Sequence, residues 1–238
     1  MKGFLFDISG NWAHYRKPET NNNPLTHDFI TKTALLGLIG AVLGIERKAM
    51  AQLFPQFSED LLYGVCVRTP VKKESWAFTL RYVVDFFQKA PKQMEFLKNS
   101  RNRVALALRN ERSAKYFDAY QIAIQAQEAR FTPILGLHNC PAELSFIAAG
   151  EFHAGNGEFV TQSFITEHHQ LKTDKLITTS AFAKGFRLGV ERVPTFQNDD
   201  FWNPPEKYVR VIYPSEGKEL IASGDYFQFS DESQWVLI

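Results

Sequence analysis

Residues suited to binding a single-stranded nucleic acid lie within a short segment near the N-terminus. Trp12, His14 and Tyr15 are rings on which bases can stack, and Arg16 and Lys17 are cations that can neutralise phosphates. Aromatic side chains interleaved with basic ones are typical of such binding surfaces. An ordinary polar loop anchored by one Trp has the same composition, so this segment alone leaves both interpretations open.

A second group of candidates lies around a glycine-containing apolar run. Gly37, Gly40 and Gly44 fall on one face of a helix, although an interior helical glycine costs about 1 kcal/mol relative to alanine. Free N–H groups near Lys32 and Thr33 at the helix start suit a phosphate. We expect Gly40 and Gly44 to serve close packing of the helix on a sheet, and we keep Gly37 as a candidate for RNA contact. No Gly-Lys-Ser/Thr follows, which excludes a nucleotide P-loop.

Three arginines flank a further apolar segment. Arg101, Arg103 and Arg109 stand at the ends of an alternating run, where charges often mark only the exit of a strand to solvent. On an RNA-binding sheet they would instead face the RNA, and we include them among the candidates.

Metal and redox chemistry find little support in the sequence. His138 and Cys140 supply two possible ligands, whereas a structural zinc site usually needs four in two close pairs. We therefore predict no metal and no cofactor. The only two cysteines, Cys66 and Cys140, lie far apart, as is typical of a reducing cytoplasm, although they could pair. The apolar run over residues 34–45 is too short to cross a bilayer, and we expect a cytoplasmic protein with no membrane partner.

The elements that must position these residues follow from periodicity. Strands are predicted over residues 2–9, 61–68, 76–87, 103–109 and 132–137, with helices over 34–43, capped by Thr31 or Thr33 and ended by Gly44, and over 111–128. A long polar loop covers residues 12–29. This order is the ferredoxin-like plan of an α+β protein, which the RRM shares. Residues 142–238 form a β-rich subdomain with strands near 186–194, 208–214, 219–222 and 226–229, after a first domain over residues 1–141.

Charge divides the chain in the same way. The 27 Lys and Arg and 26 Asp and Glu give a net charge of +1, but residues 1–130 carry +7 and residues 131–238 carry −6. A hydrophobic content of 45% excludes a disordered tail and a collagen-like fibre. The basic half is the part that carries the RNA-binding candidates.

Several motifs resemble one protein family. They are Phe6-Asp7-Ile8-Ser9-Gly10-Asn11-Trp12-Ala13-His14, then Arg16-Lys17, Asn23-Pro24-Leu25-Thr26, the run from Thr33 to Gly44, and Leu135-Gly136-Leu137-His138-Asn139-Cys140-Pro141-Ala142-Glu143-Leu144. This pattern is similar to the fifth family of CRISPR-associated (Cas) proteins, the RAMP subunit of type I Cascade, and most like subtype I-B. The residues of the C-terminal third add little to the resemblance.

The resemblance implies a non-catalytic subunit of an antiviral ribonucleoprotein that binds the 5′ handle of the crRNA and caps the backbone filament. Its partners would be the crRNA, the Cascade backbone subunit, the large subunit and target DNA near the PAM. It also implies a thumb between the second and third strands of the RRM-like domain, here about residues 71–101. Lys72, Lys73 and Arg101 of this thumb, with other lysines, suit a phosphate track.

Two alternative functions remain open. One branch of the family, in subtype I-C, cuts guide precursors with residues of the Tyr, Lys and His types, and His14, Tyr15 and His27 are available here. A Lys-His pair is missing from the thumb, where Lys98-Asn99-Ser100-Arg101 stands, so we predict no catalytic residues. The other alternative is a ferredoxin-like domain that binds only proteins.

Overall fold

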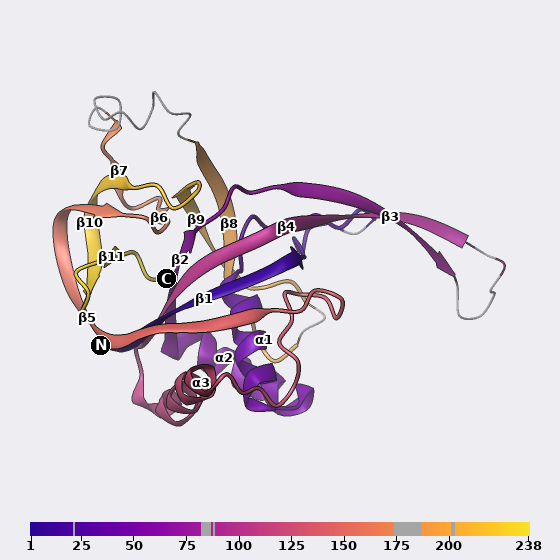
Figure 1. Ribbon diagram of the computed structural model, residues 1–238, viewed down its shortest axis with the longest axis horizontal. Coiled ribbons are helices and arrows are strands. Elements are labelled where there is room, and N and C mark those ends of the chain that lie inside the picture. The colour runs from indigo at the N-terminus through magenta and orange to yellow at the C-terminus, as the bar shows by residue number, and fades with distance from the viewer. Residues whose placement is uncertain (21, 82–86, 88, 174–186, 201–202) are drawn as a thin grey trace.

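The protein combines an extensive antiparallel β structure with helices gathered on one side of it. The computed structural model describes residues 1–238 except 21, 82–86, 88, 174–186 and 201–202. A large sheet has the strand order β11-β10-β5-β1-β4-β2, with β3 pairing β4 and β7 pairing β10, and a smaller sheet has the order β6-β9-β8. The helices α1, α2 and α3 lie together below the large sheet in the view of Figure 1.

Strand β1 (Lys2–Ala13) is the central strand of the large sheet. It pairs antiparallel with β4 (Lys89–Leu108) on one side and with β5 (Glu143–Thr161) on the other. The sequence predicted its end at Ser9, but the strand continues because Gly10 still pairs with Ser100 and Trp12 with Lys98. Trp12 is therefore a strand residue and does not belong to the polar loop.

The three α-helices follow local signals to different extents. Helix α1 (Lys32–Leu43) is capped by Thr31, whose Oγ1 accepts the N–H of Ala34 at 3.2 Å, and it ends at Gly44 with φ 72°. Helix α3 (Ala114–Ala126) follows a 3₁₀ turn (Glu111–Ser113) and confirms the predicted second helix. Helix α2 (Arg47–Asp60) was not predicted, because it contains Pro55, a residue that usually breaks helices.

The expected reason for Gly40 was wrong. A Cβ at this position would lie 2.7 Å from the sulfur of Met50 in α2, so Gly40 permits close packing between two helices and not between a helix and the sheet. Gly44 adopts a left-handed conformation that ends α1, and a Cβ there would meet the side chain of Arg130.

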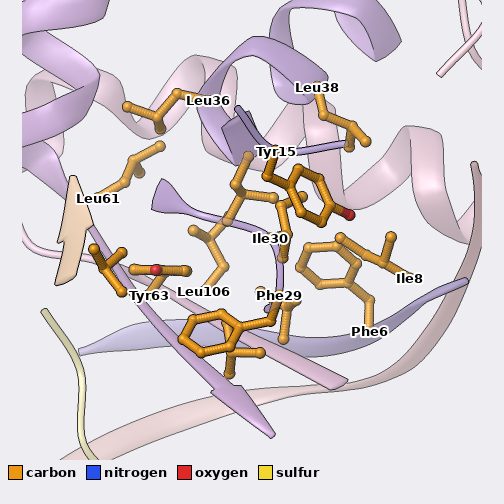
Figure 2. Packing of buried hydrophobic residues seen from close by; sticks show 14 of the residues in the cluster. Phe6, Ile8, Tyr15, Phe29, Ile30, Leu36, Leu38, Leu61, Tyr63 and Leu106 are labelled. Atoms are coloured by element: carbon orange, nitrogen blue, oxygen red, sulfur yellow. The ribbon is translucent and has the colours of Figure 1, made fainter. Parts of the chain in front are cut away.

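The main core lies between the helices and the large sheet. Alternate residues in the first part of β1 contribute a ring or branched side chain to it, namely Phe4, Phe6 and Ile8, all fully buried. Figure 2 shows this cluster with Tyr15, Phe29, Ile30, Leu36, Leu38, Leu61, Tyr63 and Leu106. The segment after β1 therefore belongs to the core through its aromatic residues, although its composition is that of a loop.

Strand β4 runs without interruption through two environments, so the predicted break between a polar segment and a strand at residue 103 was wrong. Its first half pairs with β3 (Lys73–Arg81) in a hairpin that projects far from the sheet in Figure 1, and its second half pairs with β2 (Leu61–Val67). Asn99, with φ 52°, marks the point where β4 changes partner. The residues of the predicted thumb cover this hairpin, of which residues 82–86 and 88 lie outside the described residues. The strand predicted over 76–87 is described as far as Arg81 and again at Phe87, which lies in a turn.

Strand β5 was not predicted from the sequence. It connects the two predicted domains. It pairs first with β1 and then with β10 (Leu220–Phe229). The large sheet therefore contains strands from both sides of the domain boundary predicted between residues 141 and 142. The two short strands predicted within 219–229 are one strand. The strand predicted over 132–137 is a turn closed by a bridge between Ile134 and Pro141.

The remaining strands complete both sheets. The smaller sheet contains β6 (Ile165–Thr166), β8 (Leu188–Phe196) and β9 (Lys207–Pro214), while β7 (Gln170–Leu171) and β11 (Gln234–Trp235) flank β10. Phe186, the first residue of one predicted strand, lies outside the described residues. Across the described ranges, no helix is both long and apolar enough to span a membrane, and both cysteines are free and buried.

Candidate functional site

Two segments far apart in the sequence meet at the end of β1. The N–H of His14 donates to the carbonyl of Leu135 at 2.9 Å. Gly136 follows with φ 90°, and a Cβ on it would lie 1.9 Å from the carbonyl oxygen of His14. Only glycine permits this close approach, since any side chain would collide with the backbone of β1.

A groove of about 500 Å³ opens between this junction and the start of α1. It brings together four of the predicted candidates, His14, Tyr15, Arg16 and Thr33. The remaining lining residues are Pro24, Thr31, Ala34, Phe54, Met94, Gly136, Leu137 and Gln197. The N-terminus of α1 carries a partial positive charge, and Arg16 is exposed beside it, so the groove favours an anionic ligand.

The two ring side chains of the groove are uncharged near neutral pH. The His14 Nδ1 lies 2.7 Å from the carbonyl oxygen of Glu95 and donates to it, and burial lowers the pKa of His14. Burial also raises the pKa of Tyr15, whose hydroxyl has no hydrogen-bond partner among the described residues. The positive charge of the groove therefore comes from Arg16, whose guanidinium donates to the carbonyl of Thr20.

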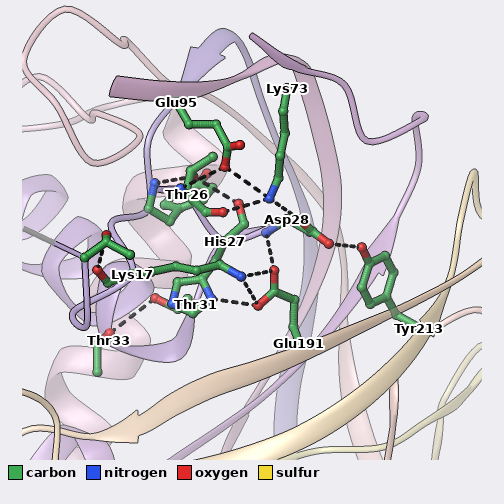
Figure 3. Close-up of polar contacts among 12 residues, drawn as sticks. Lys17, Thr26, His27, Asp28, Thr31, Thr33, Lys73, Glu95, Glu191 and Tyr213 are labelled. Carbon is green, nitrogen blue, oxygen red and sulfur yellow. Dashed lines mark hydrogen bonds and ion pairs between the residues drawn. The ribbon is translucent and has the colours of Figure 1, made fainter. Parts of the chain in front are cut away.

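A buried carboxylate, Glu191 of β8, anchors the loop that follows β1. Its oxygens lie 3.0 Å from Lys17 Nζ and 3.0 Å from His27 Nδ1 (Figure 3). Burial alone would raise the pKa of Glu191, but the hydrogen bonds and charges of His27 and Lys17 outweigh it and lower the pKa. Lys17, predicted as an RNA contact, thus has a carboxylate partner within the chain.

A second polar cluster joins the same loop to the hairpin. Asp28 accepts the hydroxyl of Tyr213 and lies 2.7 Å from Lys73 Nζ, which also lies 3.3 Å from Glu95 (Figure 3). Burial would lower the pKa of Lys73, but Asp28 and Glu95 raise it, so Lys73 stays protonated. Lys73, another predicted RNA contact, holds the base of the hairpin against the loop.

Trp12 lies outside the groove, at the base of the hairpin. Its ring contacts Trp76 with centroids 4.4 Å apart, and Lys98 Nζ lies 5.5 Å from its centroid. Trp12 and the exposed Arg101 both line a separate hollow of about 310 Å³, to which Asn139 also contributes. The hollow adjoins the turn that begins at Gly136.

The remaining candidates lie in different surroundings. Arg103 forms a two-pronged ion pair with Asp7 at 2.8 and 3.0 Å, which raises the pKa of the arginine. Lys72 is exposed at the start of the hairpin, and Gly37 is exposed on α1 with nothing within 4 Å of an added Cβ. Lys32 and Arg109 line another cavity.

Several groove residues were not foreseen from the sequence. Phe54 lies on the unpredicted α2, and Gln197 follows β8, where no sequence signal pointed to the groove. Gly136 had a signal, since it belongs to a motif that also contains His138 and Cys140. Among the described residues no group of three or more His, Cys, Asp or Glu side chains is arranged to hold a metal ion.

Comparisons with known proteins place the chain in a family. The model of the family described as CRISPR-associated protein (Cas_Cas5) matches residues 3–146, more than half of the chain. A solved structure described as a CRISPR protein from Archaeoglobus fulgidus shares the fold with a TM-score of 0.58 and 12% identity, and the match covers 99% of this chain and 98% of that one. A chain of a CRISPR RNA-guided surveillance complex matches with a TM-score of 0.56 and 12% identity over 90% of both chains. No curated protein matches the sequence. The family match includes β1, the groove-lining residues of α1 and the Gly136 turn, and the chain therefore belongs to the CRISPR-associated Cas_Cas5 family.

Proposed function

We propose that this chain is a non-catalytic subunit of a type I CRISPR Cascade, of subtype I-B, and that it binds the 5′ handle of the crRNA. The observation that carries the proposal is the groove formed where the end of β1, the start of α1 and the Gly136 turn meet. Its volume of about 500 Å³ falls in the usual range of ligand pockets. The groove presents the exposed Arg16 guanidinium beside the N-terminus of α1, which suits contact with an RNA phosphate, and the buried His14 and Tyr15 form part of its wall.

The projecting hairpin supports the second part of the proposal, contact with neighbouring subunits. It carries exposed Lys72 at its start, and Lys92 donates to the side chain of Asn22 while Lys98 pairs with Glu74. We propose that the hairpin is the thumb, that it reaches the Cascade backbone subunit, and that the large subunit and target DNA near the PAM lie beside this chain. One structural relative belongs to an RNA-guided surveillance complex, which supports this assignment.

The topology supports a ferredoxin-like domain at the centre of the protein. The strands β5-β1-β4-β2 are neighbours in this order and antiparallel throughout, with α1 and α3 in the two connections of the β-α-β-β-α-β plan and α2 added before β2. We propose that residues 1–141 and the first half of β5 form this domain, with the β-rich part attached through the second half of β5.

Binding of a labelled handle RNA to the purified chain tests the groove. We expect Arg16→Gln to weaken binding about tenfold, as the loss of a hydrogen bond to a charged group costs about 1.5 kcal/mol. The slope of log K against log salt should fall by about 0.7, since one phosphate contact is lost. Lys115→Gln is the matched control, because it removes the same charge from an exposed position on α3. Equal losses in both variants, or none in Arg16→Gln, would exclude the groove as the binding site.

The same preparation separates the two alternatives. A guide-precursor endoribonuclease would cut a labelled repeat RNA in EDTA, and the activity would disappear in His14→Ala. Tyr15 is a poor candidate for the base, because its hydroxyl is buried and its pKa is raised. A domain that binds only proteins would show no salt-dependent affinity for the handle RNA.

A further inference from the structure

A second cavity, of about 630 Å³, shares no lining residue with the groove. It opens beside the end of α2, the exit of β4, the turn between β6 and β7, and the start of β9. Lys32, the first residue of α1, and Arg109, the residue after β4, both line it.

Lys32 is an unusual lining residue because it is 3% exposed and its amino group has no partner among the described residues. Across the described ranges, no carboxylate, carbonyl or hydroxyl lies within hydrogen-bond distance of its Nζ. Burial lowers the pKa of Lys32 to about 7, and the nearby positive charge of Arg109 adds to the effect. Buried ammonium groups normally have an anionic partner, so this position lacks a component that the chain itself does not supply.

The acidic groups around the cavity do not fill this role. Glu59 forms an ion pair with Arg112 at 2.6 Å, and Asp225 accepts a hydrogen bond from Asn156 at 2.6 Å. Glu167 is exposed in the turn after β6.

The other basic groups of the cavity have contacts of their own or are exposed. His169 is held by Thr166 and by the carbonyl of Asp225, Lys207 lies over the ring of Phe196 with 4.7 Å to the centroid, and His168 is exposed. The part of the cavity next to Lys32 and Arg109 is therefore positively charged.

We propose that this cavity binds a phosphate group, with Lys32 and Arg109 as its cationic contacts. A guanidinium and an ammonium together provide the directional and the point-charge contacts that phosphate oxygens accept. The phosphate comes either from the backbone of an RNA or from a free phosphate compound. The inference shares the ligand class of the proposed function but concerns a different place in the fold.

Calorimetric titration of the full chain with inorganic phosphate tests the site. We expect Lys32→Met and Arg109→Gln each to weaken binding at least tenfold, while Lys115→Gln on α3 leaves it unchanged. Lys32→Met replaces a buried charge by an apolar chain of similar length, and Arg109 is exposed, so at least the second variant keeps the fold. Phosphate affinity that is unchanged in both cavity variants, or absent in the parent protein, would overturn the proposal.

A pH series with sulfate, whose charge is constant over the range used, gives a second measurement. Binding should weaken about fivefold between pH 7 and pH 8, because Lys32 loses its proton around pH 7. The Lys32→Met variant should lose this dependence, whereas the same pH dependence in Lys32→Met would contradict the assignment.

Displacement of phosphate by a single-stranded handle RNA then identifies the source. Competition indicates an RNA phosphate, and simultaneous binding of both indicates a free phosphate compound, and each result supports the site. Failure of the groove proposal would appear instead as an unchanged handle affinity in Arg16→Gln, so the two proposals fail separately.

Discussion

The same substitution at two glycines should have opposite effects on stability. Gly136 has φ 90°, and a Cβ there would lie 1.9 Å from the carbonyl oxygen of His14. Gly37 lies within α1, is exposed, and has nothing within 4 Å of an added Cβ. We therefore use Gly136→Ala and Gly37→Ala as a matched pair.

The magnitudes follow from these surroundings. A left-handed conformation costs alanine about 1–2 kcal/mol. Relieving the collision requires the turn to move by about an ångström, which breaks the hydrogen bond from His14 to Leu135 and costs a further 1–3 kcal/mol or so. Gly136→Ala should lower the free energy of unfolding by about 2–5 kcal/mol and the Tm by about 4–20 °C. Gly37→Ala should raise the free energy by about 1 kcal/mol and the Tm by about 2–4 °C.

Thermal unfolding of the two variants, followed by circular dichroism, measures both shifts. A Gly136→Ala protein with an unchanged Tm would refute the close approach of the turn to β1, and a Gly37→Ala protein with a lower Tm would refute the open surroundings of Gly37. The Gly37→Ala variant also tests whether RNA contacts α1. If the guide backbone approaches α1 at Gly37, handle affinity falls in this variant although its stability rises.

Three further predictions concern charge and packing. Glu191→Gln removes the partner of Lys17 and His27 and should lower the free energy of unfolding by about 3 kcal/mol near pH 7. Because the folded-state pKa of Glu191 is lowered, this stabilisation is present above pH 4–5 and disappears as the pH falls further, so denaturant unfolding of the two proteins should converge in acid. Between pH 7 and about 10, Lys32 binds fewer protons in the folded state than in the unfolded state. The free energy of unfolding of the parent protein should therefore rise by about 2–3 kcal/mol between pH 7 and 9 relative to that of Lys32→Met, and denaturant midpoints measure this rise. Trp76→Ala should expose the β3–β4 hairpin to limited proteolysis and lower global stability by about 2 kcal/mol or less, since its half-buried ring packs on Trp12 and Phe96 at the base of the hairpin. A Tm drop without faster hairpin cleavage would contradict this.

Local signals in the sequence were sufficient for the elements with clear periodicity. The alternation around Phe4 and Phe6 identified β1, and Gly44 marked the end of α1. The predicted cap was Thr31 or Thr33, and the structure shows that it is Thr31. The predicted order of strands and helices was also correct as far as α3, apart from the missing α2, but the strand expected over 132–137 is a turn. Helix α2 was missed because Pro55 argues against a helix, and the packing of Met50 and Phe57 that overrides it depends on tertiary contacts.

The polar residues were harder to interpret, because residue type does not reveal the partner. The segment from Trp12 to Lys17 has the composition of an RNA-binding loop, yet Trp12 packs on the hairpin and Lys17 pairs with Glu191, a residue far along the chain. Glu191 lies in the β-rich part, where no motif drew attention to it. His14, Tyr15 and Arg16 do share a groove, and Gly136 in the second motif proved to be the residue that lets it form.

The central position of β1 has a consequence for synthesis of the chain. β1 leaves the ribosome before its two neighbours, β4 and β5, which end at Leu108 and Thr161. At a synthesis rate of about 5–20 residues per second, roughly 7–30 seconds pass before both edges of β1 can be paired. During this interval an apolar strand with two open edges is available to other nascent chains. Slowing translation before β5 should therefore lower the soluble yield of this protein more than a pause placed after it.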